Sequence, residues 1–331
     1  MLFISEKIPA KLLDVSAQQL HEILPGPTLI HLSGRREQPL FVSVLMHGNE
    51  DTGFVAAQKI LREFQNKELP RSLSLFIANI SAAKKNVRRL DNQPDYNRIW
   101  PGSDDIESPE ALMMKQVFEE MKKRQVFASV DIHNNTGTNP FYACVNRLEH
   151  KHLQLATLFS RIVLYFIHPQ GVQSIAMSKL CPAVTLECGK VNSPNNEQIA
   201  YEYINACLHL SELPAHSVAA HDIELFHTVA QVKVPNKHSF SFSDKNADIV
   251  FHEDIDHMNF RELPAGTVLG SLKPNSDAQL QACSEAGIDI SREFFNNHNN
   301  QINLEKAIMP AMLTLNEEVI RQDCLCYLME R

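Results

Sequence analysis

The sequence predicts an α/β fold with a mixed central sheet and helices on both faces, followed by a smaller β-rich C-terminal domain. The chain has 331 residues, of which 44% are hydrophobic and 21% are charged, which is enough for a buried core. From about residue 38 to 211, apolar runs of strand length alternate with segments of helical periodicity, as in an α/β sheet. After residue 214 only short strand-like runs remain, separated by Pro, Gly and Asn. We therefore expect domains at residues 1–214 and 215–331.

The elements of both domains follow from the spacing of the apolar residues. In the first domain, strands are predicted at residues 40–46, 73–80, 127–132, 161–167 and 182–186. One helix is predicted around residues 54–64, and two more begin at Ser108-Pro109 and Ser193-Pro194, because Ser caps a helix and Pro suits its first position. In the second domain, strands are predicted at residues 225–234, 239–242, 267–272 and 308–315.

Charge, hydropathy and cysteine content exclude several classes of protein. There are 39 acidic and 31 basic residues, a net charge of -8, which gives no general attraction to nucleic acid. No apolar run approaches the ~18 to 20 residues that cross a bilayer, and the N-terminus lacks the pattern of a signal peptide. The seven cysteines contain no CxxC pair, which indicates reduced thiols. We expect a cytoplasmic protein that binds neither nucleic acid nor membranes; whether it forms a homo-oligomer stays open.

The first candidate site residues are His47 and Glu50, which directly follow an apolar strand. Gly48 and Gly53 flank Glu50 and allow tight turns. The HxxE pattern recurs twice further along the chain, so its position carries more information than the pattern itself. Ligand sites in open α/β sheets gather at the carboxyl ends of strands, which is where this pair lies.

A second pair, Asp131 and His133, ends another predicted strand. His133 together with His47 and Glu50 makes the two-histidine, one-glutamate set that holds catalytic zinc and leaves a position for water. Asp131 leaves the strand on the same face as His133 and could orient a ligand imidazole, that of His47 being one candidate. The alternative is a hydrogen-bonded Asp and His that only end the strand.

Two further groups of polar residues could carry chemistry. Glu187 ends an apolar strand, where a carboxylate is costly to bury, and it would suit a general base. The alternative is a Glu that caps the following turn. Arg88 and Arg89, with Asn97 and Arg98, could clamp a carboxylate, because guanidinium pairs with it through two hydrogen bonds. The alternative there is a solvated basic loop.

Taken in order, these segments resemble the succinylglutamate desuccinylase/aspartoacylase family of the wider zinc carboxypeptidase-like group. The matching text is HGNE at 47–50, NISAAKKNVRRL and DYNRIWPG within 79–102, DIHNN at 131–135 and TLECGK at 185–190. Four ordered motifs are far more specific than any one of them. The match runs over roughly residues 40 to 190.

The resemblance implies a role for each matching residue. The residues that match the ligands of one zinc ion per chain are His47, Glu50 and His133. Glu187 matches the general base, and Asn97 with Arg98 matches the pair that holds a substrate carboxylate. Arg88 most resembles the arginine that polarises the scissile carbonyl. Arg89 competes for this role, because the stretch up to Asn97 is about two residues longer than usual.

The resemblance therefore implies a zinc-dependent hydrolase that cleaves the amide bond of an N-acyl amino acid. Its substrate is expected to be a small molecule that carries a carboxylate. One alternative is a zinc carboxypeptidase acting on small peptides, which differs in the side of the amide that carries the clamped carboxylate. The other alternative is a catalytically silent relative that keeps the pocket and binds a ligand.

Overall fold

The structure, a computed structural model, describes residues 1–331 and divides into two compact units. The first unit holds residues 1–134 and 141–224, and the second holds residues 135–140 and 225–331. The division into functional domains at residue 214 stays a prediction. None of the helices has both the length and the apolar character needed to cross a bilayer.

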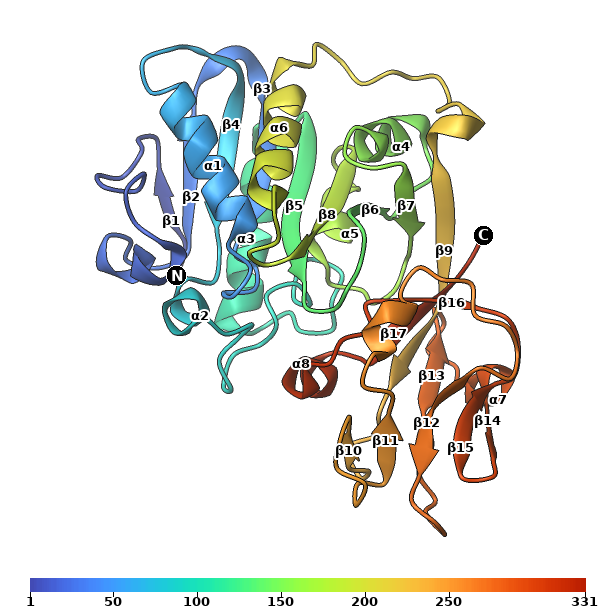
Figure 1. The fold of residues 1–331 in the computed structure, drawn as a ribbon. Coiled ribbons are helices and arrows are strands. Elements are labelled where there is room, and N and C mark those ends of the chain that lie inside the picture. The colour runs from blue at the N-terminus through green and yellow to red at the C-terminus, as the bar shows by residue number, and fades with distance from the viewer. The chain divides into compact units, whose positions relative to one another are not determined.

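The first unit is a mixed sheet with helices (Figure 1). Its strands are β1 Phe3–Ser5, β2 Thr28–Leu32, β3 Gly34–Val44, β4 Leu69–Ile77, β5 Ala128–Asn135, β6 Tyr142–Val145, β7 Ile162–Tyr165 and β8 Ala183–Lys190. Their order is β1-β2-β4-β3-β5-β8-β6-β7. Strand β3 is parallel to β4 and β5, whereas β2 is antiparallel to β4 and β6 is antiparallel to β8. The helices are α1 Thr52–Glu63, α2 Ile80–Lys85, α3 Pro109–Lys123, α4 His150–Thr157, α5 Gln173–Met177 and α6 Asn196–His209, with 3-10 turns η1 Ala17–Glu22 and η2 Ala220–Asp222.

Helices cover both faces of this sheet, as predicted. On one face, Gly53 of α1 lies so close to β5 that an added Cβ would come within 2.8 Å of Ile132. Helix α6 packs beside α1 (Figure 1). On the other face, Phe41 of β3 meets Trp100 with ring centroids 6.4 Å apart. The buried residues of α3 join this second cluster: Ala111, Met113, Met114, Val117 and Met121.

The start of α3 agrees with the sequence prediction. Ser108 is the N-cap, and its hydroxyl accepts a hydrogen bond from the Ala111 N–H. Pro109 follows at the first helical position, where its missing N–H costs nothing. Such a cap contributes about 1 kcal/mol to helix stability.

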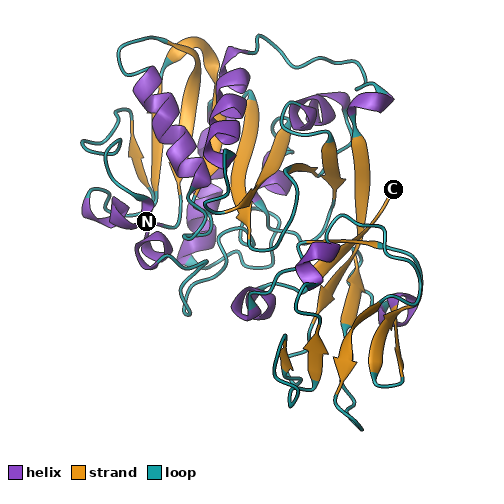
Figure 2. Cartoon of the chain, in the orientation of Figure 1, coloured by secondary structure: helices purple, strands orange, loops and turns teal.

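The second unit is β-rich, which confirms the predicted C-terminal fold (Figure 2). Strands β9 Glu224–Lys233, β13 Gln281–Ser284, β16 Met309–Ala311 and β17 Cys326–Glu330 pair with one another. A separate sheet has the order β10-β11-β12-β15-β14, formed by β10 Phe240–Ser241, β11 Ile249–Phe251, β12 Val268–Leu272, β14 Phe295–His298 and β15 Gln301–Leu304. Its helical segments are η3 Ile255–Met258, α7 Ser291–Phe294 and α8 Glu317–Gln322.

Candidate active site

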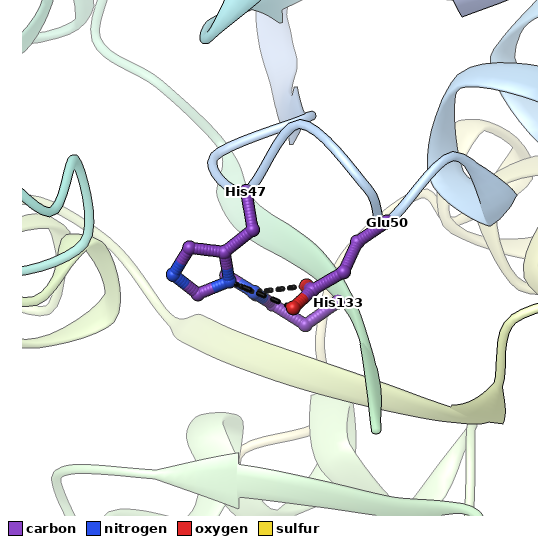
Figure 3. Close-up of side chains that lie close together, drawn as sticks. All are labelled: His47, Glu50 and His133. Carbon is purple, nitrogen blue, oxygen red and sulfur yellow. Dashed lines mark hydrogen bonds and ion pairs between the residues drawn. The ribbon is translucent and has the colours of Figure 1, made fainter. Parts of the chain in front are cut away.

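Three polar side chains converge where β3 and β5 end (Figure 3). His47 and Glu50 lie between β3 and α1, and His133 lies on β5. Glu50 Oε1 is 2.8 Å from His47 Nδ1, and Glu50 Oε2 is 2.9 Å from His133 Nδ1. The two Nδ1 atoms are 3.2 Å apart, and all three residues are buried. The structure therefore brings together the three predicted metal ligands.

The turn that carries His47 and Glu50 depends on a glycine. A Cβ on Gly48 would lie 2.2 Å from the backbone of Ala82 in α2, so only glycine lets the turn rest on that helix. The Gly48 N–H donates to the carbonyl oxygen of Arg88 at 3.1 Å. Just before the turn, Leu45 has a φ of 57°, a strained conformation for a residue with a side chain. Strain of this kind persists where the surrounding packing fixes it.

The outer nitrogen of each histidine faces a carboxylate. His133 Nε2 is 2.8 Å from Asp131 Oδ2, and His47 Nε2 is 3.1 Å from Asp95 Oδ1. Ionised carboxylates only accept, so each Nε2 has an acceptor for its proton when Nδ1 binds a metal. Of the two imidazoles that Asp131 could orient, it faces that of His133, because alternate residues of one strand share a face. The carboxylate beside His47 is Asp95, which the sequence reasoning did not assign.

These residues fit a zinc ion. With Nε2 protonated, two imidazole lone pairs and two carboxylate oxygens point at one another within about 3 Å, and a cation among them removes the repulsion. Two nitrogens and a carboxylate are a donor set that zinc prefers. Without a metal, a proton takes this role. Burial opposes a charge on His133, yet Asp131 and Glu50 raise the pKa of this imidazole well above its ordinary value.

Glu50 stays ionised in the middle of this group. Burial alone would raise its pKa. The neighbouring imidazoles of His47 and His133 outweigh burial and hold the pKa of the carboxyl group well below its ordinary value. An ionised Glu50 is the form that binds a metal.

Glu187 lies on β8, the neighbour of β5 in the sheet. The Ser129 backbone N–H donates to the Pro182 carbonyl at 2.9 Å. Farther along the strands, the Asn134 side-chain Nδ2 donates to the Gly189 carbonyl at 3.0 Å. The two strands therefore end together. Burial raises the pKa of Glu187 to about 8, with His133 acting in the opposite direction. A cation beside it would favour its carboxylate form.

The structure distinguishes Arg88 from Arg89, the two candidates for the arginine that polarises the scissile carbonyl. Arg88 Nη2 donates to Asp95 Oδ2 at 2.9 Å, and Arg88 Nη1 lies 3.9 Å from Glu50 Oε1. Arg89 instead donates to the backbone carbonyl of Gln93 at 3.0 Å. Arg88 is thus the arginine beside the candidate metal ligands.

Of the predicted carboxylate clamp, Asn97 lies at the candidate metal ligands. Its Nδ2 is 3.3 Å from His133 Nε2, and its backbone N–H donates to Asp95 Oδ1 at 2.8 Å. Arg98 is half-buried, and its Nη1 donates to the Asn97 carbonyl at 2.8 Å. Asp95 therefore contacts one ligand imidazole, Arg88 and the clamp loop. One signal in the sequence pointed to a residue of this kind. Each of the two ligand imidazoles needs a carboxylate or carbonyl partner, and Asp131 can serve only one of them.

Comparisons with known proteins identify the family and the fold. A profile of the succinylglutamate desuccinylase/aspartoacylase catalytic domain matches residues 38–212. The succinylglutamate desuccinylase of Chromobacterium violaceum has a similar fold, with a TM-score of 0.60 and 18% identity over 90% of this chain and 85% of that one. The succinylglutamate desuccinylase/aspartoacylase of Rhodobacter sphaeroides gives a TM-score of 0.58 and 13% identity over 91% and 88% of the two chains. Murine aminoacylase 3 gives 0.57 and 13% over 90% and 96%.

The sequences of curated proteins give no significant match. The catalytic-domain profile nevertheless covers more than half of the 331 residues. The protein therefore belongs to the succinylglutamate desuccinylase/aspartoacylase family.

Proposed function

We propose that this protein is a zinc-dependent hydrolase that cleaves the amide bond of an N-acyl amino acid. The observation that carries the proposal is the buried group of His47, Glu50 and His133, with Glu187 on the adjacent strand. Its structural neighbours include a succinylglutamate desuccinylase and an aminoacylase, names that denote removal of an acyl group from an amino acid. The family membership and the donor chemistry thus support the same reaction.

The metal would be held by His47, Glu50 and His133, one ion per chain. A bound zinc ion polarises a carbonyl oxygen and lowers the pKa of water to about 7. Asp131 and Asp95 hold the two imidazoles in the tautomer that leaves Nδ1 free for the metal.

The residues around the metal ligands would each take a defined part. The carboxylate of Glu187 accepts a proton from the attacking water and then delivers it to the nitrogen of the leaving amine. The new C–O bond and the broken C–N bond give a carboxylic acid and an amino acid. The guanidinium of Arg88 donates hydrogen bonds to the oxygen on which negative charge develops. Asn97 and Arg98 hold a carboxylate of the substrate.

The experiment is metal analysis followed by a substrate screen. Protein purified without chelator should contain about one zinc per chain, and His133→Ala should lose most of it. The zinc form should then hydrolyse N-acyl amino acids in preference to short peptides. Preference for peptides would favour a carboxypeptidase. A wild-type protein that takes up no zinc would instead favour a silent relative that only binds a ligand.

We also propose a cytoplasmic location. The seven cysteines are thiols outside any disulfide bond, and six of them are buried. Reduced thiols of this kind are typical of a reducing compartment.

A further inference from the structure

A buried amide side chain lies behind the candidate metal ligands. Gln173, the first residue of α5, has no exposed surface. Its Nε2 donates to the hydroxyl oxygens of Ser129 at 2.8 Å and Ser43 at 3.1 Å. The Ser43 hydroxyl in turn donates to Asp131 Oδ1 at 2.7 Å. Since the other oxygen of Asp131 faces His133, a chain of hydrogen bonds runs from Gln173 to a metal ligand.

Gln173 also reaches the proposed substrate clamp. Its backbone N–H donates to Asn97 Oδ1 at 2.9 Å. This contact fixes the orientation of the Asn97 amide, whose Nδ2 lies 3.3 Å from His133 Nε2. One residue therefore contacts both the support of a metal ligand and a residue of the clamp.

The direction of the hydrogen bonds depends on the Gln173 side chain. Because the Gln173 amide donates to Ser43, the hydroxyl proton of Ser43 is available for Asp131. The alternative acceptor for this proton, the carbonyl of Val130, is farther away at 3.4 Å. An amide donor, a hydroxyl and a carboxylate in sequence polarise one another, and this strengthens each bond.

The Gln173 amide is costly to keep in the core. Its Oε1 is buried and has no hydrogen-bond partner. A buried carbonyl oxygen without a hydrogen bond is destabilising, and an apolar side chain of the same size would avoid this cost. Turning the amide over would leave two N–H donors unpaired in place of one acceptor. The two donated hydrogen bonds are thus what this side chain contributes.

We propose that Gln173 is a positioning residue that couples the metal ligand His133 to the substrate clamp at Asn97. The coupling rests on the proposed function, because it assumes zinc at His133 and a substrate carboxylate at Asn97. Gln173 acts through Ser43 and Asp131 on the imidazole, and through its backbone N–H on the clamp. It touches neither the metal nor the substrate.

The test replaces Gln173 with Met, which keeps the length of the side chain and removes both donors. The zinc Kd, measured by competition with a chromophoric chelator, should rise about 10-fold, as for other residues that support metal ligands. KM for the N-acyl amino acid should rise as well. The backbone N–H that contacts Asn97 Oδ1 is still present, but the start of α5 that carries it is no longer held in place by the two side-chain hydrogen bonds. The matched control is Gln58→Met. Gln58 is a buried amide that donates to the carbonyls of Leu12 and Val15 at 2.8 Å.

The control should lower the thermal unfolding midpoint and leave both zinc Kd and KM unchanged. Ser43→Ala breaks only the branch toward Asp131, so it should raise zinc Kd and leave KM unchanged. It removes a single hydroxyl and tests the same branch if Gln173→Met does not fold. The double variant Ser43→Ala/Gln173→Met should bind zinc no more weakly than the weaker single variant, because both act through one chain of bonds.

Two results would overturn the inference and leave the proposed function intact. One is a folded Gln173→Met protein with the zinc Kd and KM of the wild type. The other is a Gln58→Met protein that shows the same losses as Gln173→Met. A wild-type protein that binds no zinc would instead overturn the proposed function and this coupling with it.

Discussion

Replacing Asp95 with Asn should weaken zinc binding about 10- to 100-fold, because Asp95 supports a ligand imidazole. This loss corresponds to about 1.4–2.8 kcal/mol of binding free energy. Asp95 accepts three hydrogen bonds, from His47 Nε2 at 3.1 Å, from Arg88 Nη2 at 2.9 Å and from the Asn97 N–H at 2.8 Å. An Asn side chain offers one acceptor oxygen in place of two, and its NH₂ group would face a donor of His47 or Arg88.

The charge of Asp95 matters as much as its shape. Burial would raise its pKa, but the charges of Arg88 and His47 hold it well below its ordinary value. The carboxylate is therefore ionised throughout the pH range of an assay. Its loss removes an ion pair from Arg88, whose side chain is mostly buried at 11% exposed. We expect kcat to fall together with zinc affinity, because Arg88 loses the contact that aims it at the candidate active site.

Zinc affinity should be measured by chelator competition, and kcat and KM with saturating zinc. Asp105→Asn is the matched control. Asp105 accepts hydrogen bonds from the backbone N–H groups of Glu107 and Ser108 just before α3. Its replacement should leave zinc affinity unchanged. Wild-type zinc affinity in Asp95→Asn would show that Asp95 does not support His47, and would refute the tautomer argument.

Three other outcomes are expected. Glu187→Gln should abolish turnover and keep zinc bound, because the amide cannot accept the proton of water; full activity would remove Glu187 from the mechanism. Arg98→Ala should mainly raise KM for carboxylate-bearing substrates, whereas an unchanged KM would place the clamp elsewhere. Burial and the charge of Arg124 lower the pKa of His31 to about 4. The unfolded chain, with a pKa near 6.5, therefore binds this proton more readily, and stability falls as pH drops from about 6.5 toward 4. At pH 5 this group lowers the free energy of unfolding by about 2 kcal/mol. The check is to compare unfolding midpoints at pH 7 and pH 5, because His31→Gln should lack this loss.

The central strands and the long helices could be predicted from sequence because their buried positions are marked by a regular spacing of apolar residues. Strand β5 is buried along its whole length, and its apolar residues Ala128, Val130 and Ile132 all fall within the predicted strand at residues 127–132. Strand β3 begins six residues before the predicted start. Its first residues, among them Arg35 and Glu37, are largely exposed and polar, so they carry no apolar signal. Short strands such as β6 were not predicted, because four residues show no period.

The candidate metal ligands were predictable for a different reason from their supports. His47, Glu50 and His133 each lie at a strand end, where a polar residue after an apolar run stands out. Asp95 lies on a loop without periodicity, and Gln173 is an uncharged residue on a five-residue helix. Their roles depend on contacts between segments distant in sequence, such as the 76 residues that separate Asn97 from Gln173. Spacing within one segment cannot show such contacts.

Along one face of the sheet, the side chains change from apolar to polar toward the site. On this face β3 carries Phe41 and then Ser43, which lie opposite Ser129 and Asp131 of β5. The apolar core that holds Phe41 against Trp100 thus becomes polar as the strands approach their ends. A slip of one residue in β5 would turn Asp131 and His133 toward α1 and bring Val130 and Ile132 to the site. Because that slip would bury a carboxylate in an apolar layer, the same packing that stabilises the sheet also fixes the candidate metal ligands.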